Sequence, residues 1–288
     1  MHGVESLNYI SLATYMINHP NAKMLCDNHT DEFNSVKHWT TKLWSKFVVR
    51  NIIVKRLIPV TKYFYGTTPL QSEFMINHYN IPQRKIKLLF MGADDECLHF
   101  DKRSSIRSSI RELYGFSNDD FLIVTGGRIN YNKGKEILKL VEAVNDVEEK
   151  SVKLLIFGAI SKECKKEFDD VCSSKVALAG LLPSEKIYDY FLASDLVVFP
   201  GLHSVLWEQA VASKTPCAFN HIRGFEHIDV GGNCILMDSH DISYYKKIIN
   251  QLSNDTDFYN HLKSVARSSK SEIFLYSHIA QSIIDDVC

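Results

Sequence analysis

Short apolar runs alternate with amphipathic segments along most of the chain, and their spacing predicts the secondary structure. From about residue 86 onward, the runs predict buried strands at 86–91, 121–124, 152–157, 176–179, 196–199, 217–220 and 234–237. Helical spacing between them predicts helices at 136–147, 162–172, 184–193 and 206–212. Strands that alternate with helices indicate a parallel sheet covered on both faces, which is the doubly wound α/β class.

The first 85 residues follow a less regular pattern. It predicts a helix within 1–19, a short strand at 22–26, a long helix at 36–58, a strand at 61–65 and a helix at 69–79. The tail from residue 241 to residue 288 is mainly helical in pattern. A chain of 288 residues has room for one large domain or two modest ones.

The composition is that of an ordinary soluble globular protein, with 45% hydrophobic and 23% charged residues. The formal net charge of -1 gives no general reason to expect nucleic acid as a partner. Seven cysteines without CxxC spacing favour reduced thiols and a cytoplasmic setting. Because the histidines and cysteines are scattered without ligand spacing, we expect neither a metal nor a cofactor.

One segment, Val-Thr-Gly-Gly-Arg-Ile-Asn-Tyr-Asn-Lys-Gly-Lys at 124–135, joins a predicted strand to a predicted helix. We expect Arg128 and Lys133 to lie in this turn, where backbone N–H groups and the positive end of the helix attract an anion. A guanidinium binds phosphate in a bidentate manner and an ammonium acts as a point charge. The segment therefore predicts a phosphate site for a nucleotide, with solvated turn residues as the alternative.

Five short motifs occur in a fixed order: Met-Gly-Ala-Asp at 91–94, Gly-Arg…Lys-Gly at 127–134, Ile-Phe-Gly at 156–158, Gly-Leu-Leu-Pro at 180–183 and Asp-Leu-Val-Val-Phe-Pro at 195–200. This ordered set resembles the donor domain of GT-B fold glycosyltransferases of family 4 type, also called glycosyl transferases group 1. The resemblance implies a GT-B-like fold, a nucleotide-sugar donor, and transfer that retains the anomeric configuration without a metal. It also implies that Gly127, Arg128 and Lys133 hold the donor diphosphate.

The donor loop at 200–212 departs from the family pattern of two glutamates separated by seven residues. Strict register places Gly201 at the first glutamate and Gln209 at the second. The sequence His-Ser-Val-Leu-Trp-Glu-Gln at 203–209 resembles a polysaccharide-assembly subset of the family in which this loop is shorter. We therefore expect Glu208 to bind the ribose and His203 to contact the sugar or a phosphate. The remaining donor-binding candidates are the backbone amides of Ser204, Val205 and Leu206. The alternative for Glu208 is a carboxylate that complements a helix dipole.

The second departure is at the front of the chain, which resembles only part of an acceptor domain. We therefore expect three regions: a partial acceptor-side domain at 1–85, a donor-binding domain at 86–250, and helices at 251–288 that pack back toward the first region. Either a partner covers the exposed strand edges of the partial domain or the chain is a truncated remnant. His29 is the catalytic candidate on the acceptor side, because the family often has a histidine at the end of a strand there; the alternative is a polar loop.

Residues 37–56 predict an amphipathic helix with one basic and one aromatic stripe. The basic stripe is Lys42, Lys46 and Arg50, and the aromatic stripe is Trp39, Leu43 and Phe47. Such a helix either lies on an anionic membrane surface or packs its aromatic stripe onto a sheet, and the second option is the more ordinary one.

The function that the sequence predicts is transfer of a sugar from a UDP- or GDP-sugar to a saccharide acceptor, lipid-linked or free, in surface polysaccharide assembly. We expect the protein to be cytoplasmic, with peripheral membrane contact as an option. Two alternatives stay open: a catalytically inactive nucleotide-sugar-binding remnant, and a nucleotide-sugar epimerase.

Overall fold

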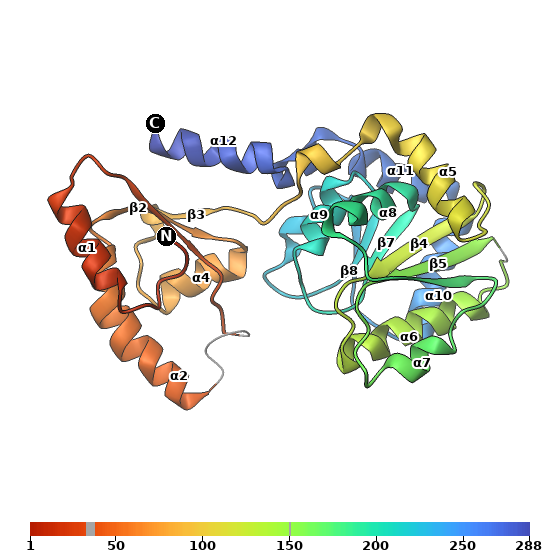
Figure 1. The fold of residues 1–288 in the computed structure, drawn as a ribbon, viewed down its shortest axis with the longest axis horizontal. Helices are drawn as coiled ribbons and strands as arrows, with labels where there is room; N and C mark the ends of the chain where they lie inside the picture. The colour runs from red at the N-terminus through yellow and green to blue at the C-terminus, as the bar shows by residue number, and fades with distance from the viewer. Residues whose placement is uncertain (33–37, 150) are drawn as a thin grey trace. The chain divides into compact units, whose positions relative to one another are not determined.

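A computed structural model describes residues 1–32, 38–149 and 151–288, and the chain divides into two compact units (Figure 1). The first unit contains Met1–Met91, Arg223–His227 and Ser277–Cys288. The second contains Gly92–Ile222 and Ile228–Tyr276. The region 251–288 is thus shared, since its last twelve residues belong to the first unit and the rest to the second.

A six-stranded parallel sheet in the order β6-β5-β4-β7-β8-β9 forms the centre of the second unit. Its strands are β4 (Phe121–Gly126), β5 (Val152–Phe157), β6 (Val176–Gly180), β7 (Leu196–Phe199), β8 (Cys217–Asn220) and β9 (Cys234–Met237). Counted from β4, this is the order 3-2-1-4-5-6 of a doubly wound sheet, so the predicted fold class is confirmed. Every strand predicted between residues 121 and 237 is present.

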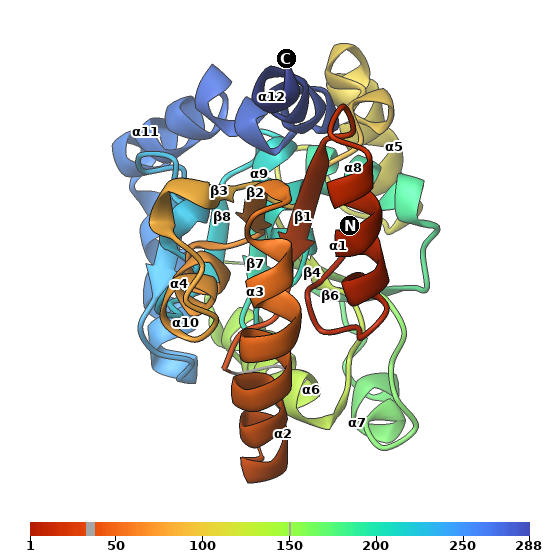
Figure 2. The ribbon, with the colours of Figure 1, turned by 90° about the vertical axis from the view of Figure 1, so that its left-hand side faces the viewer.

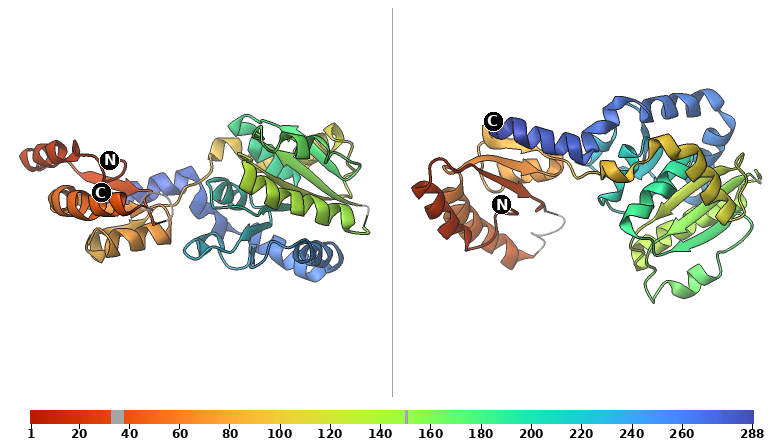
Figure 3. Two further views of the ribbon diagram at one scale, coloured as in Figure 1. Left: turned by 90° about the horizontal axis from the view of Figure 1, so that it is seen from below. Right: turned by 45° about the horizontal axis from the view of Figure 1, so that its top comes forward.

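Helices cover both faces of this sheet, as Figures 1 and 3 show. One face packs against α6 (Tyr131–Asp146), α7 (Lys165–Asp169) and α10 (Ile242–Asn254) in a single apolar cluster. The other face is aromatic: Phe157 and Phe199 contact Phe191 of α8 (Ile187–Ala193), and Phe219 stacks on Trp207 of α9 (Leu206–Ala212). Because alternate residues of a strand point to opposite faces, strands buried on both sides are apolar throughout, which is why the sequence reveals them.

Helix boundaries in the second unit differ from the predicted ones. The helix predicted from residue 136 begins at Tyr131, so Lys133 lies in its first turn and only Arg128 lies in the preceding turn. The helix predicted at 162–172 shortens to α7, and Ser184 opens a 3-10 turn instead of capping a helix with its side chain. Two helices, α5 (Arg103–Leu113) and α11 (Thr256–Ala266), complete this unit.

A three-stranded parallel sheet, β1 (Met24–Asn28), β2 (Thr61–Gly66) and β3 (Ile86–Leu88), forms the first unit. Helices α1 (Tyr9–Asn18) and α4 (Pro69–Asn77) belong to this unit, as does all of α12 (Tyr276–Val287) beyond its first residue. Asp286 of α12 accepts a hydrogen bond of 2.6 Å from the Tyr65 hydroxyl and pairs with Lys87, which ties the C-terminal helix to β2 and β3. At the other edge, the backbone of Met1 and Gly3 bonds to that of Asp27, so the N-terminal residues extend the sheet.

The predicted long helix is continuous from Trp39 to Leu57 as α2 (Trp39–Trp44), a π-helix (Ser45–Val54) and α3 (Lys55–Leu57); Figure 2 shows it standing beside β1. Its start at residues 36–37 lies outside the described residues. The buried positions are Ser45, Val49, Ile53, Val54 and Leu57. The aromatic stripe is therefore turned outward, with Trp39 73% and Phe47 58% exposed, and the expectation that it packs onto the sheet is wrong within the described part. No described helix has the length and apolar character to cross a bilayer.

Candidate functional site

A cavity of about 590 Å³ opens at the carboxyl ends of the strands of the second unit. Its wall is built from the segments that follow β4, β7, β8 and β9. Its lining residues include Arg128, Asn130, Lys133, Lys135, Glu136, Gly201, Ser204, Leu206, Asn220 and His240. Because β4 and β7 are the neighbouring strands from which the chain winds in opposite directions, this is the topological switch point where doubly wound sheets bind ligands.

Two glycines shape the turn that follows β4. Gly127 has a φ of +106° and Gly158, which follows β5, has a φ of +116°. A Cβ atom on Gly158 would lie 1.9 Å from the carbonyl oxygen of Gly127, so only glycine allows the two turns to pack together. This close approach fixes the backbone conformation immediately before Arg128.

The first turn of α6 places Lys133. Asn130 is the N-cap, and its side-chain oxygen accepts the Lys133 N–H at 3.0 Å. The Lys133 side chain then runs between two glycines, because a Cβ on Gly127 would lie 3.0 Å from its Nζ and a Cβ on Gly201 would lie 3.4 Å from its Cγ. The Nζ atom lies over the ring of Phe199, 5.6 Å from the centroid. Small residues at positions 127 and 201 thus leave the space that the ammonium group occupies.

The cations of this cavity are not neutralised by the protein. Among the described residues, neither Arg128 nor Lys133 forms a salt bridge. Glu136, the single carboxylate among the lining residues that the structure describes, instead pairs with Lys139 at 3.2 Å and with His240 at 3.4 Å. Burial lowers the pKa of Lys133 to about 8, because the charged form loses solvation without gaining a carboxylate. Arg128 and Lys133, together with Lys135 on the same wall, therefore provide a site for a ligand of negative charge.

The donor loop contributes unevenly to the wall. Ser204 and Leu206 line the cavity. Val205 precedes α9 and is not among the lining residues. His203 and Glu208 also lie off the wall and bond to each other, with His203 Nε2 2.8 Å from Glu208 Oε1. Glu208 is fully buried, so its carboxylate would have to leave His203 to reach a ribose.

Two polar residues of the cavity, Asn220 and His240, lie outside the segments that the sequence predicts to bind the donor. The Nε2 atom of His240 lies 2.7 Å from Oδ1 of Asn220, which links the ends of β9 and β8. A signal was present in the sequence, because Asn220 ends a predicted strand, His240 follows another, and carboxyl ends of parallel strands share one rim.

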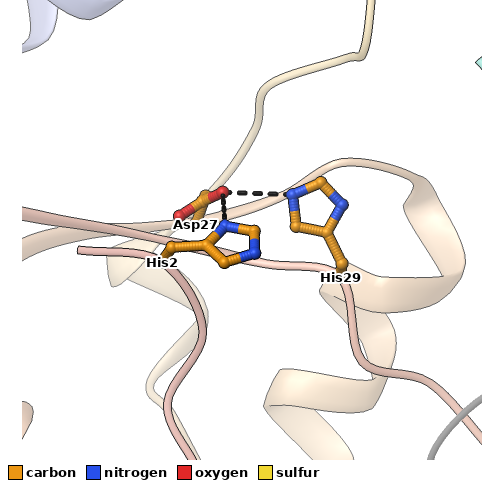
Figure 4. A group of neighbouring side chains, drawn as sticks. All are labelled: His2, Asp27 and His29. Atoms are coloured by element: carbon orange, nitrogen blue, oxygen red, sulfur yellow. Dashed lines mark hydrogen bonds and ion pairs between the residues drawn. The ribbon is translucent and has the colours of Figure 1, made fainter.

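His29 belongs to the first unit and lies just past the end of β1 (Figure 4). Its Nε2 atom is 3.1 Å from Oδ2 of Asp27, and the Nδ1 atom of His2 is 2.8 Å from the same oxygen. Burial raises the pKa of Asp27, but the hydrogen bonds and charges of both histidines outweigh burial and lower it to about 2. Asp27 is therefore a carboxylate at any physiological pH, and it fixes the orientation of His29.

Comparison with known proteins shows which proteins this chain is similar to. The profile of the family described as glycosyl transferases group 1 matches residues 120–255, which include the whole turn and the donor loop. Over these residues the chain is similar to the group 1 glycosyltransferases. The chain as a whole is an α/β protein of GT-B type.

Relatives and solved structures agree with this assignment. An uncharacterized glycosyltransferase of Methanocaldococcus jannaschii is 23% identical over 230 residues, which are 74% of this chain and 56% of that protein. Mannosylfructose-phosphate synthase of Agrobacterium fabrum is 23% identical over 236 residues, 76% of this chain and 51% of the synthase. The crystal structure of Anabaena Alr3699/HepE with UDP superposes with a TM-score of 0.73 at 16% identity, covering 97% of this chain and 75% of the other. The chain spans about half the length of the curated relatives it matches.

Proposed function

We propose that this protein is a retaining glycosyltransferase that transfers a sugar from a UDP- or GDP-sugar to a saccharide acceptor. One observation carries the proposal: Arg128 and Lys133 line the switch-point cavity, and among the described residues neither has a carboxylate partner. A nucleoside diphosphate supplies the missing negative charge. The family match over 120–255 and a solved neighbour that binds UDP support the same ligand class.

In the proposed reaction, the acceptor hydroxyl oxygen bonds to the anomeric carbon while the bond from that carbon to the β-phosphate oxygen breaks. Negative charge grows on the departing diphosphate, which takes up the hydroxyl proton. Arg128 and Lys133 stabilise that charge, and the low dielectric around Lys133 strengthens its share. The amides of Ser204, Val205 and Leu206 are proposed as further contacts to the donor. Ribose binding by Glu208, with His203 turned to the sugar or a phosphate, is proposed to follow when their mutual bond opens.

On the acceptor side we propose His29 as the group nearest the incoming hydroxyl, with Asp27 as its orienting carboxylate. The acceptor itself is proposed to be a growing surface saccharide, either free or lipid-linked. A lipid-linked acceptor fits the helix from Trp39 to Leu57, whose outward residues combine an aromatic stripe with Lys42 and Lys46. Aromatic residues insert at the headgroup level and lysines pair with anionic lipids, so this surface is suited to peripheral contact with a membrane.

A nucleotide panel followed by a transfer assay tests the proposed function. UDP, GDP, CDP and ADP are added separately in thermal unfolding, and a ligand at about 100 times its dissociation constant stabilises the fold by about 2.7 kcal/mol. The best nucleotide then selects donor sugars for transfer, and NMR of the product reports the anomeric configuration. Binding without transfer or donor hydrolysis would favour the inactive binding module. An epimerised donor formed without any acceptor would favour the epimerase.

Vesicle flotation tests the membrane proposal separately. The wild-type protein is expected to float with vesicles rich in phosphatidylserine and to remain unbound with phosphatidylcholine alone. Replacing Trp39 and Phe47 by Ser should abolish flotation, whereas replacing the similarly exposed Tyr131 of the second unit by Ser should leave it intact. Equal flotation of both variants would remove this helix from the proposal.

A further inference from the structure

Three side chains of the first unit converge on one point at the edge of the sheet (Figure 4). His2 Nδ1 and His29 Nε2 approach the same oxygen of Asp27, at 2.8 Å and 3.1 Å. The three ligand atoms all lie within 4.8 Å of one another. The sequence spacing concealed this group, because His2 is 25 residues away from Asp27 along the chain.

The backbone holds the three residues in place. His2 forms a parallel β-bridge with Asp27: the Asp27 N–H donates to the Met1 carbonyl at 3.0 Å, and the Gly3 N–H donates to the Asp27 carbonyl at 2.8 Å. The terminal ammonium of Met1 also donates to the Leu25 carbonyl at 2.8 Å. His29 is two residues beyond Asp27, and residues two apart on an extended chain share one face of the sheet. The convergence therefore follows from strand pairing and does not depend on a flexible loop.

A buried hydrogen-bond chain orients the far side of the His29 ring. Gln71 is buried, and its Nε2 donates to the His29 carbonyl at 3.0 Å and to Asp31 Oδ2 at 3.4 Å. Because the amide nitrogen faces these two acceptors, the Gln71 oxygen faces Thr67, whose hydroxyl donates to it. The Thr67 oxygen can then only accept from Nδ1 of His29, 3.5 Å away.

Because these hydrogen bonds place Nδ1 of His29 against Thr67, the ring nitrogen that faces the carboxylate of Asp27 is Nε2. A nitrogen lone pair and a carboxylate oxygen at 3.1 Å repel each other unless a cation lies between them. A proton is one such cation and a metal ion is another. A histidine whose second ring nitrogen is fixed by a buried partner is the usual arrangement of a metal ligand.

We propose that His2, Asp27 and His29 bind a divalent transition-metal ion of the zinc class, with water or a substrate oxygen as the fourth ligand. Two imidazoles and one carboxylate form the ligand set of open zinc sites, whereas Mg²⁺ and Ca²⁺ prefer oxygen ligands throughout. Metal–ligand bonds of about 2.0–2.2 Å at tetrahedral angles place ligand atoms roughly 3.4 Å apart. The observed separations need only small rotations of exposed side chains to reach that value.

Metal titration of the whole chain tests the proposal. For this titration the protein is prepared without a histidine tag and with Met1 as its first residue. The exposed Cys172 and Cys288 are replaced by Ser, so that their thiols do not bind the metal. After treatment with a chelator, calorimetry should show Zn²⁺ binding that depends on His2 and His29, and Co²⁺ should give the intense visible absorption of a tetrahedral complex. Mg²⁺ and Ca²⁺ should give no heat of binding.

Substitutions of the proposed ligands test where the metal binds. Replacing His2 or His29 by Ala should weaken Zn²⁺ binding at least tenfold, and Thr67→Val should weaken it about tenfold by releasing the His29 ring. His221 is the matched control: its Nδ1 pairs with Asp238 at 2.6 Å, and this pair lies outside the three-residue group, so His221→Ala should change nothing. His2 is largely exposed, which keeps the His2→Ala variant folded. An absent Co²⁺ spectrum, or Zn²⁺ binding that is unchanged in both the His2→Ala and His29→Ala variants, would overturn the proposal.

Discussion

Lys133 Nζ lies over the ring of Phe199, 5.6 Å from its centroid, and in the part of the chain that the structure describes no carboxylate pairs with it. A half-buried ammonium group without a counter-ion costs stability, because its lost hydration is not repaid within the protein. Such an arrangement persists at sites where a ligand supplies the opposite charge, so stability and binding conflict at this position.

Replacing Lys133 by Met should therefore stabilise the ligand-free protein. The methionine fills the space between Gly127 and Gly201 without a buried charge. We expect the free energy of unfolding in urea at pH 7 to rise by at least about 1 kcal/mol, a gain typical of removing functional strain. Lys139→Met is the control: Lys139 pairs with Glu136, so its removal should have no such benefit. A lower urea midpoint for Lys133→Met would contradict this view of the site.

The pKa of Lys133 also predicts how nucleotide affinity depends on pH. With a value of about 8 in the free protein, Lys133 is charged at pH 7 and mostly neutral at pH 9. UDP affinity should fall across this range, with proton uptake on binding, since the diphosphate favours the charged form. Calorimetry in buffers of different ionisation enthalpy measures that uptake, and the Lys133→Met variant should show none.

The lowered pKa of Lys133 also makes stability depend on pH. Stability should rise with pH, whereas nucleotide affinity should fall. The folded pKa of about 8 is below the ordinary lysine value of 10.5, so the unfolded chain binds more protons between these values. The contribution of Lys133 to the free energy of unfolding should therefore increase as pH rises from about 8 to 10.5. Urea unfolding of the wild type and of Lys133→Met at pH 7 and pH 10 measures this contribution. The difference in free energy of unfolding between the two proteins should be smaller at pH 10.

A second buried cation, Arg111, has a structural function. It is fully buried and donates to Asp195 Oδ2 at 2.6 Å, while Arg107 binds the other oxygen of Asp195 at 2.8 Å. The Leu122 N–H donates to the same carboxylate at 2.9 Å, which ties α5 to the start of β4. Removing one partner of a buried ion pair costs about 3–5 kcal/mol, so Arg111→Met should lower the free energy of unfolding by that amount. UDP affinity of the folded fraction should be unchanged, and a selective loss of affinity would contradict a structural role.

The glycine contact between the two turns predicts a geometric effect. In Gly158→Ala the new methyl group would collide with the Gly127 carbonyl and shift the turn that carries Arg128. We expect both stability and UDP affinity to fall. Gly180→Ala is the matched control, because Gly180 also has a positive φ, +70°, but nothing lies within 4 Å of its Cβ position. It should lose about 1 kcal/mol through backbone strain and keep its affinity.

The sequence predicted those parts of the molecule that depend on local patterns. Leu196–Phe199 and its neighbouring strands are buried on both faces, so their apolar runs are unambiguous. The start of α6 was misplaced because its first turn, Tyr131 to Lys135, is polar, although Asn130 offered a capping signal. The α5 helix was missed because its one fully buried side chain is the charged Arg111, whose partner Asp195 is 84 residues away. The aromatic stripe was misread because Trp39, Leu43 and Phe47 recur every four residues, as the buried Ser45, Val49 and Ile53 do, so spacing alone does not tell which stripe is buried.

Contacts between residues distant in the sequence limited how far the candidate sites could be predicted. Arg128 and Lys133 could be predicted because one turn and one helix bring them together. Glu208 is buried against His203 only because α9 packs on the aromatic face of the sheet, which no local pattern reveals. The approach of His2 to Asp27 depends on a strand bridge between distant segments, and sequence spacing carries no trace of it.

Calorimetric titration of UDP and GDP into the wild type and into an Arg128→Gln, Lys133→Met double variant tests the central claim most directly. Each lost charge-assisted contact is worth about 1.5–3 kcal/mol, so the double variant should bind at least about a hundredfold more weakly while remaining folded. The Lys139→Met control should bind like the wild type. Unchanged affinity in the double variant would contradict the assignment of this cavity as the donor site.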